Sequence, residues 1–376
     1  MACREFKLGE KRLPYFYGFQ CEQALSDLLQ AEFTDYSNVL MLIDSTVGGH
    51  ARAMLDEFSV DGRSEVIPIV VDIAEKGKTV SRVGDLMERA IAAGVARNSA
   101  VVAMGGGVLG NIAGMVAALL YRGIPLVHLP TTPVAAFDAV LSAKQAVNLS
   151  QGKNLCGTFL EPSFIACDLA WLNTVSPEQI LRGAAEMAKN VLAVTPDLGD
   201  LFLGALDTQT EPDRSLHALL DIGISAKEPY LAVDPKEKNE ALVFEYGHTV
   251  GHALEFASGG AMSHGEAVAW GMLAAADIAR ELCGLPDTAW VRHRQLVSAL
   301  GIRRDRLSAL SVRAVTDLLR TDNKRGYLRC GDDHSPMVLL EDLGRPVMSQ
   351  GRPLTAVPYS LLDAVVDRLL AGEDND

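Results

Sequence analysis

The stretch from Ala100 to Tyr121 constrains the fold more than any other segment, because Asn111 is its single strongly polar side chain. Its length and hydropathy imitate a membrane span, but five glycines interrupt it. Three of these, at 105–107, are contiguous and would break a helix near its start. We therefore expect a buried strand over residues 100–104, a glycine turn, and a buried helix over residues 112–121.

The first half of the chain repeats this alternation of short apolar strands and helical segments. Strands are expected at Asn38–Asp44, Glu65–Val71 and Ile124–Leu129, and a helix at Asp85–Gly94. Alternation of this kind predicts parallel strands joined by helical crossovers. In such sheets ligands bind at the carboxyl ends of the strands.

The pattern becomes mostly helical from about Pro177. Helices are expected at Gln179–Ala193, Leu216–Ala226, Thr249–Phe256, Glu266–Cys283 and Arg292–Leu300. The sequence thus predicts an α/β protein with a Rossmann-like parallel-sheet domain, residues 1–172, followed by a mostly α-helical domain, residues 173–376. A cleft between two such domains is the expected active site.

Composition limits the partners and the compartment. The chain has 34 Lys and Arg against 48 Asp and Glu, a net charge of −14. This charge disfavours nucleic acids and anionic membrane surfaces, although small anions can still bind to a few local cations. The six cysteines form no CxxC pair, which indicates reduced thiols in a cytoplasmic protein.

Two features of the predicted sheet could bind a nucleotide. The segment from Gly105 to Gly110 follows a strand and opens a helix, so its amide N–H groups could face a pyrophosphate. Its glycines are contiguous and do not form a GxGxxG fingerprint, and a structural turn is the alternative interpretation. Asp44, at the end of a strand, could accept a hydrogen bond from a ribose hydroxyl or could be a simple strand-end acid.

Three clustered histidines give the strongest metal signal. His248 and His252 lie four residues apart on an expected helix and so share a face, and His264 follows shortly after. Neutral imidazoles together with a carboxylate are typical ligands of zinc or cobalt, whereas histidines that cap helices are the alternative. Spacing leaves open which two histidines bind the metal and which carboxylate completes the site. The competing carboxylates are Glu186, Glu245, Glu255 and Glu266.

Several lysines could serve an anionic substrate. Glu186 and Lys189 form an i, i+3 pair that could be an ordinary surface ion pair, but apolar residues flank it on both sides. Lys144, Lys153 and Lys324 lie in or beside polar segments. Taken singly, each of these three is best interpreted as a solvated lysine.

Together the motifs resemble the sugar phosphate cyclase superfamily, the relatives of 3-dehydroquinate synthase. The resemblance extends from about Asp44 to about Lys324. It rests on seven ordered motifs: MGGGVLGNIAG (104–114), RGIPLVHLPTT (122–132), FDAVLSAKQAVN (137–148), GKNLCGTF (152–159), AAEMAKN (184–190), EYGHTVGHALE (245–255) and SHGEAV (263–268). It implies a first domain that binds NAD and a second, helical domain that binds a divalent metal, zinc or cobalt.

Two positions favour one substrate class within this superfamily. Dehydroquinate synthases carry Arg-x-x-x-Asn before the Gly-His of the metal site, and the Arg holds the substrate carboxylate. The corresponding residues here are Ala241 and Glu245, which suit a neutral polyol end better. The resemblance therefore implies cyclisation of glucose 6-phosphate with release of phosphate, on the route to 2-deoxystreptamine aminoglycoside antibiotics. Dehydroquinate synthesis and sedoheptulose 7-phosphate cyclisation are the alternatives.

The resemblance also implies roles for individual residues. Glu186, His248 and His264 would bind the metal. Catalytic roles would fall to Lys144, Lys189, Glu245 and His252. The substrate would contact Arg122, Asp138, Lys153, Asn154 and Lys324, with Arg122 reaching phosphate across the interface of a homodimer. NAD would be held by Asp44, Glu75, Lys78, Gly106, Gly107, Thr131 and Thr132. Asn111 stands where many relatives have Asp.

Two other classes of protein share part of this pattern. A metal-dependent alcohol dehydrogenase would share the glycine turn, NAD and a helical metal domain, but a simple alcohol requires no lysine-rich phosphate cradle. A non-catalytic protein that kept the fold would not need the complete set of Glu186, Lys189 and the three histidines.

Overall fold

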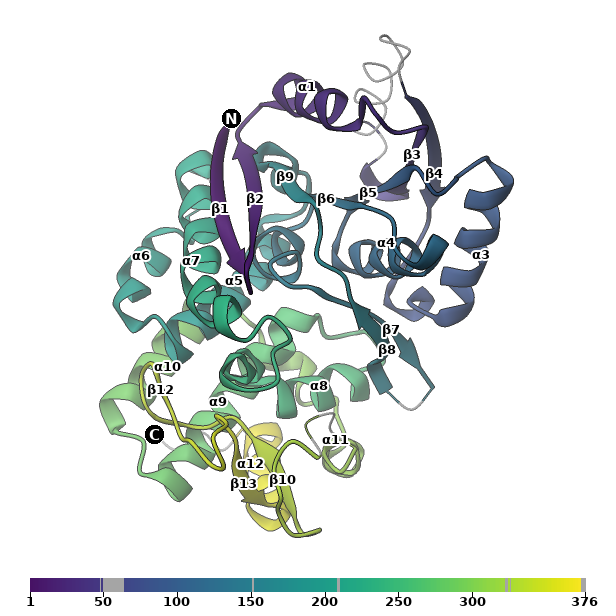
Figure 1. Cartoon of the computed structure of the whole chain (residues 1–376). Helices are drawn as coiled ribbons and strands as arrows, with labels where there is room; N and C mark the ends of the chain where they lie inside the picture. Colours follow the sequence, from purple (N-terminus) through teal and green to yellow (C-terminus); the bar gives the residue numbers. More distant parts are fainter. Residues whose placement is uncertain are drawn as a thin grey trace. The chain divides into compact units, whose positions relative to one another are not determined.

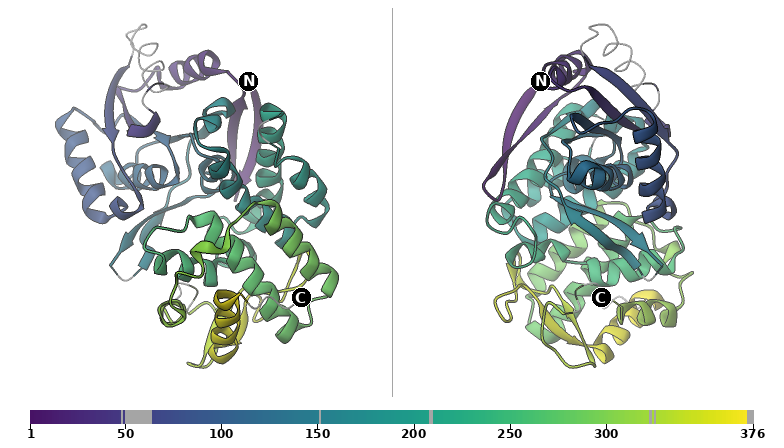
Figure 2. Two further views of the ribbon diagram at one scale, coloured as in Figure 1. Left: turned by 180° about the vertical axis from the view of Figure 1, so that it is seen from behind. Right: turned by 45° about the vertical axis from the view of Figure 1, so that its right-hand side comes forward.

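The computed structural model describes residues 1–47, 49, 64–150, 152–207, 210–321, 324 and 326–372. The chain forms two compact units, unit 1 from Met1 to Ser176 and unit 2 from Pro177 to Asp376. The sequence placed this division after residue 172. Figures 1 and 2 show unit 1 with its sheet and unit 2 with its helices.

Unit 1 is built on a seven-stranded sheet in the order β1-β2-β9-β6-β5-β3-β4. Only β1 and β2 pair antiparallel; all other neighbours in this sheet are parallel. The strands are β1 (Ala2–Leu8), β2 (Lys11–Gly18), β3 (Asn38–Asp44), β4 (Glu65–Val71), β5 (Ser99–Gly105), β6 (Leu126–Pro130) and β9 (Phe164–Asp168). The prediction of a parallel α/β domain is confirmed.

Helices cover both faces of this sheet (Figure 1). On one face, α3 (Val80–Ala92) and α4 (Gly107–Leu119) pack over side chains of β3, β4 and β5. On the other face, α1 (Glu22–Phe33) packs over the alternate side chains of the same strands. Every residue of β5 is buried, as expected for a central parallel strand whose two faces are both covered.

Five of the predicted cofactor residues end or follow strands at one edge of the sheet: Asp44, Gly106, Gly107, Thr131 and Thr132. The register pairs Gly105 with Pro130 and Ile43 with Met104, so β3, β5 and β6 end at the same level. The chain runs outward from β3 to β4 on one side, and from β5 to β6 on the other side. The direction of the strand order therefore reverses between β3 and β5. A reversal of this type is where open α/β sheets bind ligands.

A second antiparallel hairpin lies beside α4. It consists of β7 (Lys144–Leu149) and β8 (Gly152–Phe159). Short helical segments complete unit 1: η1 (Ser45–Val47), η2 (Glu75–Gly77), η3 (Leu120–Arg122), η4 (Ala135–Ala139) and η5 (Leu169–Thr174).

Unit 2 is mostly helical, as the sequence predicts. Its longer helices are α5 (Pro177–Ala193), α6 (Gly199–Gly204), α7 (Pro212–Val233), α8 (His248–Ala257), α9 (His264–Cys283), α10 (Asp287–Ala299), α11 (Val312–Leu319) and α12 (Tyr359–Ala371). Short elements are η6 (Pro196–Leu198), η7 (Glu240–Glu245), η8 (Arg304–Arg306), β10 (His334–Met337), β11 (Leu340–Asp342), β12 (Arg345–Pro346) and β13 (Thr355–Pro358). Among the described residues, no helix combines the length and apolar character required to cross a membrane.

Glycines allow the helices of unit 2 to pack backbone against backbone. A Cβ atom at Gly271 on α9 would lie 1.9 Å from the carbonyl oxygen of Gly247, just before α8. One at Gly265 would lie 1.8 Å from the carbonyl oxygen of Arg182 on α5. These contacts place the start of α8, with His248, against the third turn of α9, and the first turn of α9, with His264, against α5, which carries Glu186.

We expect Gly271→Ala to destabilise unit 2, because the new methyl group would collide with backbone that cannot rotate away. The loss should be about 1–3 kcal/mol in the free energy of unfolding, the range for overpacked cores. Gly204→Ala is the matched control, since a Cβ atom there would meet no atom within 4 Å, and its effect should stay within about 0.5 kcal/mol. Denaturant unfolding measures both, and equal stabilities would contradict this account.

Candidate metal centre and cofactor edge

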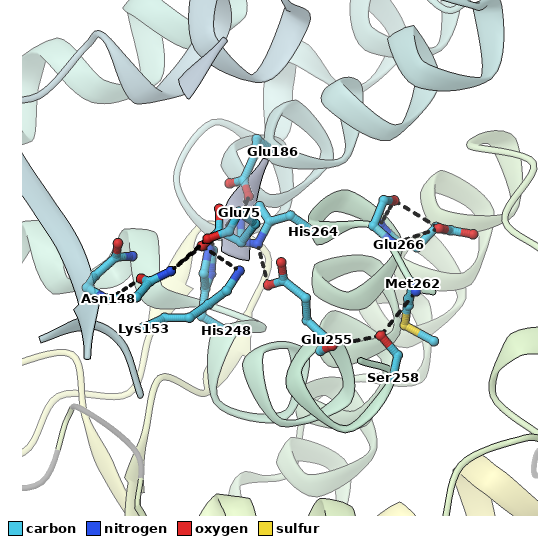
Figure 3. Close-up of polar contacts among 12 residues, drawn as sticks. Glu75, Asn148, Lys153, Glu186, His248, Glu255, Ser258, Met262, His264 and Glu266 are labelled. Atoms are coloured by element: carbon cyan, nitrogen blue, oxygen red, sulfur yellow. Dashed lines mark hydrogen bonds and ion pairs between the residues drawn. The ribbon is translucent and has the colours of Figure 1, made fainter. Parts of the chain in front are cut away.

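Glu186, His248 and His264 converge in unit 2, each offering a ligand atom within 4.8 Å of the other two (Figure 3). The Nε2 atoms of His248 and His264 lie 3.6 Å and 3.0 Å from Glu186 Oε1. Ligand atoms of a tetrahedral site with metal–nitrogen bonds of about 2.0–2.1 Å lie about 3.3 Å apart. The donor set and its spacing therefore fit a zinc- or cobalt-sized cation.

Each of these two histidines is oriented through its other ring nitrogen. His248 Nδ1 lies 3.0 Å from the carbonyl oxygen of Tyr246, and His264 Nδ1 lies 3.1 Å from Glu255 Oε2. Both partners can only accept, so both Nδ1 atoms carry hydrogens, and the Nε2 atoms, which a metal ion would use, lie toward Glu186. Metal-binding histidines commonly use this arrangement.

The centre is electrostatically prepared for a cation. Burial alone would raise the pKa of the Glu186 carboxyl, but Lys189, His248 and His264 hold it well below its usual range. Loss of water lowers the pKa of His264, yet the hydrogen bonds that its ring donates to Glu186 and Glu255 outweigh this and raise it to about 10. The proton on His264 thus places a positive charge beside Glu186, at the point where a divalent metal ion would place a larger one.

The other competing carboxylates have different partners. Glu266 closes a capping box with Ser263 and accepts from Arg306 at 2.7 Å, which fixes the start of α9 at His264. Glu245 Oε2 lies 3.7 Å from the ammonium of Lys324. Sequence spacing left four carboxylates open; the structure brings Glu186 alone of them into the cluster of potential ligands among the described residues.

Buried cations surround the centre. Lys189 Nζ lies 2.5 Å from Glu186 Oε2, and Lys324 is only 1% exposed. Sequence reasoning missed Lys227 on α7, which is 4% exposed and lies 5.6 Å from the ring centroid of Phe244, the same ring that Lys189 approaches at 5.8 Å. A lysine within an apolar helical pattern was the available signal. The structure therefore gathers more positive charge here than the motifs predict.

His252 completes this environment as a neutral imidazole. Its ring lies 5.1 Å from that of His248 and 5.9 Å from that of His264. Burial, with further contributions from His248 and Lys324, holds the pKa of His252 well below its usual value. It can thus accept or relay a proton but would not carry a charge at neutral pH.

The carboxyl edge of the sheet fits a dinucleotide. Gly106 caps α4 without a side-chain hydrogen bond, so the first amide groups of the helix are open to an anion. The buried hydroxyl of Thr131 has no hydrogen-bond partner among the described residues. A Cβ atom at Gly106 would lie 3.2 Å from the Thr132 side chain, closer than an ordinary van der Waals contact.

Other predicted cofactor and substrate residues lie together at β7 and β8. Lys78 Nζ donates to Asn154 Oδ1 at 2.6 Å, and Lys153 Nζ lies 3.3 Å from Glu75 Oε1. Lys144 begins β7. The structure thus joins residues that the sequence assigns to NAD with residues that it assigns to the substrate.

Asn111, Asp138 and Arg122 occupy distinct places in unit 1. Asn111 Nδ2 donates to the carbonyl oxygen of Gly107, and its Oδ1 accepts from the amide of Ala146, both at 2.9 Å, which ties the glycine turn to β7. Asp138 lies in η4, shortly after Thr131 and Thr132, the two threonines at the carboxyl edge of the sheet (the edge threonines). Arg122 is exposed and follows the far end of α4, so within unit 1 the fold does not bring it to the other predicted residues.

Comparison with known proteins agrees with this geometry. Models of the 3-dehydroquinate synthase N-terminal and C-terminal regions match residues 68–182 and 183–325. The chain therefore belongs to the 3-dehydroquinate synthase family of sugar phosphate cyclases, and the predicted family and lyase class are confirmed.

Curated relatives narrow the assignment within this family. A 2-deoxy-scyllo-inosose synthase of Streptomyces lividus is 41% identical over 97% of this chain and 94% of its own length. One of Streptomyces kanamyceticus is 47% identical over 78% of this chain and 76% of its own length. The prediction of a glucose 6-phosphate cyclase of this type is borne out by these relatives.

Solved structures of related enzymes have the same fold. A 2-deoxy-scyllo-inosose synthase complexed with carbaglucose-6-phosphate, NAD+ and Co2+ superposes with a TM-score of 0.89 at 34% identity, covering 97% of this chain and 99% of its own. A 2-epi-5-epi-valiolone synthase with NAD+ and Zn2+ superposes at 0.80 with 25% identity, covering 99% of this chain and 100% of its own. NAD and a divalent metal were the predicted cofactors. An iron-containing alcohol dehydrogenase at 14% identity and a TM-score of 0.65, covering 99% of each chain, shares the fold alone.

We expect Glu186→Gln to lose the metal, because an amide replaces the one anionic donor and leaves Lys189 without its carboxylate. Metal affinity should fall by more than about 100-fold, beyond the loss typical of outer-shell changes. Metal content after dialysis measures the effect. Glu178→Gln, an exposed acid on the same helix, is the control and should retain full metal; a metal-loaded Glu186→Gln protein would refute the ligand assignment.

Glu255→Gln tests the orientation of His264. The amide can still accept through its oxygen but no longer stabilises the ring with a charge, so metal affinity should fall about 10–100-fold while the ligands stay in place. Competition with a chelator of known affinity measures this change. An unchanged affinity would show that Glu255 does not orient the ligand.

Proposed function

We propose that this chain catalyses the NAD- and metal-dependent carbocyclisation of D-glucose 6-phosphate to 2-deoxy-scyllo-inosose, with release of phosphate. The observation that carries the proposal is the buried Glu186–His248–His264 centre with the ammonium of Lys189 at 2.5 Å. The product would enter 2-deoxystreptamine aminoglycoside antibiotic biosynthesis. The substrate analogue bound in the related structure supports the choice of glucose 6-phosphate.

The two expected cofactors divide the chemistry. When bound, NAD supplies reversible removal of hydride from a substrate hydroxyl, and the metal supplies a Lewis acid beside substrate oxygens. Glu186, His248 and His264 would hold the metal. The glycine turn, Asp44 and the edge threonines would hold NAD, with Asp44 at the end of β3 placed to accept from a ribose hydroxyl.

The residues of unit 2 would bind and orient the sugar. Lys189 and Lys227 would neutralise anionic oxygen near the metal centre, where low exposure strengthens their effect. Glu245, held beside Lys324, would accept hydrogen bonds from sugar hydroxyls. His252, as a neutral imidazole, would exchange a proton with the substrate.

The residues of unit 1 would bind the phosphate and its sugar. Lys144, Lys153 and Asn154 lie on one hairpin and would contact phosphate and hydroxyl oxygens, with Asp138 accepting from a hydroxyl. Cations around the phosphate would stabilise it as a leaving group.

A homodimer is part of the proposal. Arg122 is exposed and lies at the end of α4 opposite the glycine turn, so it would serve the phosphate site of a second copy. A cytoplasmic location is proposed on the six free cysteines.

The direct test incubates purified protein with glucose 6-phosphate, NAD and Co(II) or Zn(II). We expect phosphate release and a carbocyclic ketone in equal amounts without net accumulation of NADH, because the hydride returns within each turnover. Phosphate assay, mass spectrometry and absorbance at the NADH band measure the three quantities.

A substrate panel separates the alternatives. Turnover of sedoheptulose 7-phosphate or of the dehydroquinate synthase substrate in place of glucose 6-phosphate would overturn the proposal. Steady accumulation of NADH would indicate a dehydrogenase, and absence of turnover on every substrate with metal and NAD bound would indicate a binding protein.

A further inference from the structure

A polar array joins the short helical segment η2 and the following Lys78 to the hairpin of β7 and β8. We call it the loop–hairpin array and define it by five residues: Glu75, Lys78, Asn148, Lys153 and Asn154. Four of them have expected roles toward NAD or the substrate. Asn148 has none, although it lies within one of the sequence motifs.

Asn148 contacts three other members of this array. Its Nδ2 donates to Glu75 Oε1 at 2.8 Å, and its Oδ1 accepts from the amide of Asn154 at 2.9 Å. Its own amide donates to the carbonyl oxygen of Lys78 at 2.8 Å. One side chain thus holds both the segment expected to bind NAD and the segment expected to bind the sugar phosphate (Figure 3).

The surrounding contacts strengthen the same link. Lys78, only 6% exposed, donates to Asn154 Oδ1, and Lys153 pairs with Glu75. Asn154 has a φ of +55°, in the left-handed region that asparagine adopts more readily than other residues with side chains. Such a conformation persists where several contacts hold it, and here Asn148 and Lys78 supply them.

We propose that Asn148 is a positioning residue that couples the binding of NAD to the binding of the sugar phosphate. A ligand that orders Glu75 and Lys78 also orders Lys153 and Asn154 through Asn148, so the second ligand pays less of the ordering entropy. Linkage requires the effect to be reciprocal. The identity of the sugar ligand rests on the proposed function.

Asn148→Asp tests the proposal with little change in shape. Aspartate keeps an acceptor for the amide of Asn154 but places a second carboxylate against Glu75, which opens the link. In the metal-loaded wild type, carbaglucose-6-phosphate should tighten NAD binding by about 5-fold or more. In the variant, NAD should bind about 5-fold more weakly and the tightening should become smaller, with the Lys78–Asn154 and Lys153–Glu75 contacts retaining the remainder. Titration calorimetry measures both.

Two further variants separate coupling from general damage. Asn98→Asp is the matched control, since Asn98 is exposed and its side chain, among the residues that the structure describes, donates to the carbonyl oxygen of Asp35; it should behave as wild type. Asn148→Asp combined with Glu75→Gln restores a donor–acceptor pair between the two positions and should recover part of the coupling. A double variant no better than Asn148→Asp would overturn the assignment to this hydrogen bond.

The outcomes also distinguish this inference from the proposed function. Unchanged NAD affinity and unchanged coupling in Asn148→Asp, with turnover of glucose 6-phosphate intact in the wild type, would overturn the inference alone. Absence of wild-type turnover would remove the proposed function, while the effect of the variant on NAD affinity would still decide the role of Asn148. If Asn148→Asp fails to fold, Asn148→Ser gives the same comparison, since its hydroxyl is too short to bridge both partners.

Discussion

The buried carboxylate of Glu186 is the constraint on which unit 2 depends. An ionised carboxylate without water is stable only when cations and donors surround it, and Glu186 is 0% exposed. Lys189 comes from the same helix, but the two imidazoles come from α8 and α9. The helices must therefore approach closely enough for ring nitrogens to reach one oxygen, and the glycine contacts at Gly265 and Gly271 permit this approach. The close packing of α5, α8 and α9 thus stabilises unit 2 and also brings the three potential metal ligands together.

Unit 1 offers a site for an anion although the protein as a whole is acidic. The parallel sheet places the ends of β3, β5 and β6 at one edge, and a helix without a side-chain cap begins directly after the glycine turn. Backbone amides and a helix dipole then supply positive potential without any charged residue. Asn111 ties this turn to the lysine-bearing hairpin, so the groups expected to face the cofactor and those expected to face the phosphate belong to one framework.

Local patterns predicted much of this arrangement. The strands Asn38–Asp44 and Glu65–Val71 match in both bounds, because each is a continuous apolar run next to polar residues. The first is buried on both faces, and the second is the edge strand, whose side chains alternate in exposure. The β7–β8 hairpin was not predicted, because its alternation is short and its pairing partner lies across a turn. The role of Glu255 depended on a contact with a residue on another helix, and Glu266 acts through a cap. Such roles come from tertiary packing, which spacing along one helix does not encode.

The buried lysines of unit 2 favour phosphate over carboxylate as the anionic group of a substrate. Lysine presents a compact charge that suits phosphate oxygens from several directions, whereas a carboxylate is best held by the two parallel donors of arginine. Lys189, Lys227 and Lys324 are nearly buried, and Ala241 occupies the position where the resemblance places the carboxylate-binding Arg of dehydroquinate synthases. A substrate carboxylate would lose its water here without gaining a bidentate partner, and Glu245 would repel it. A sugar hydroxyl at the same place would meet an acceptor, so this group of residues suits a polyol whose only charge is on its phosphate.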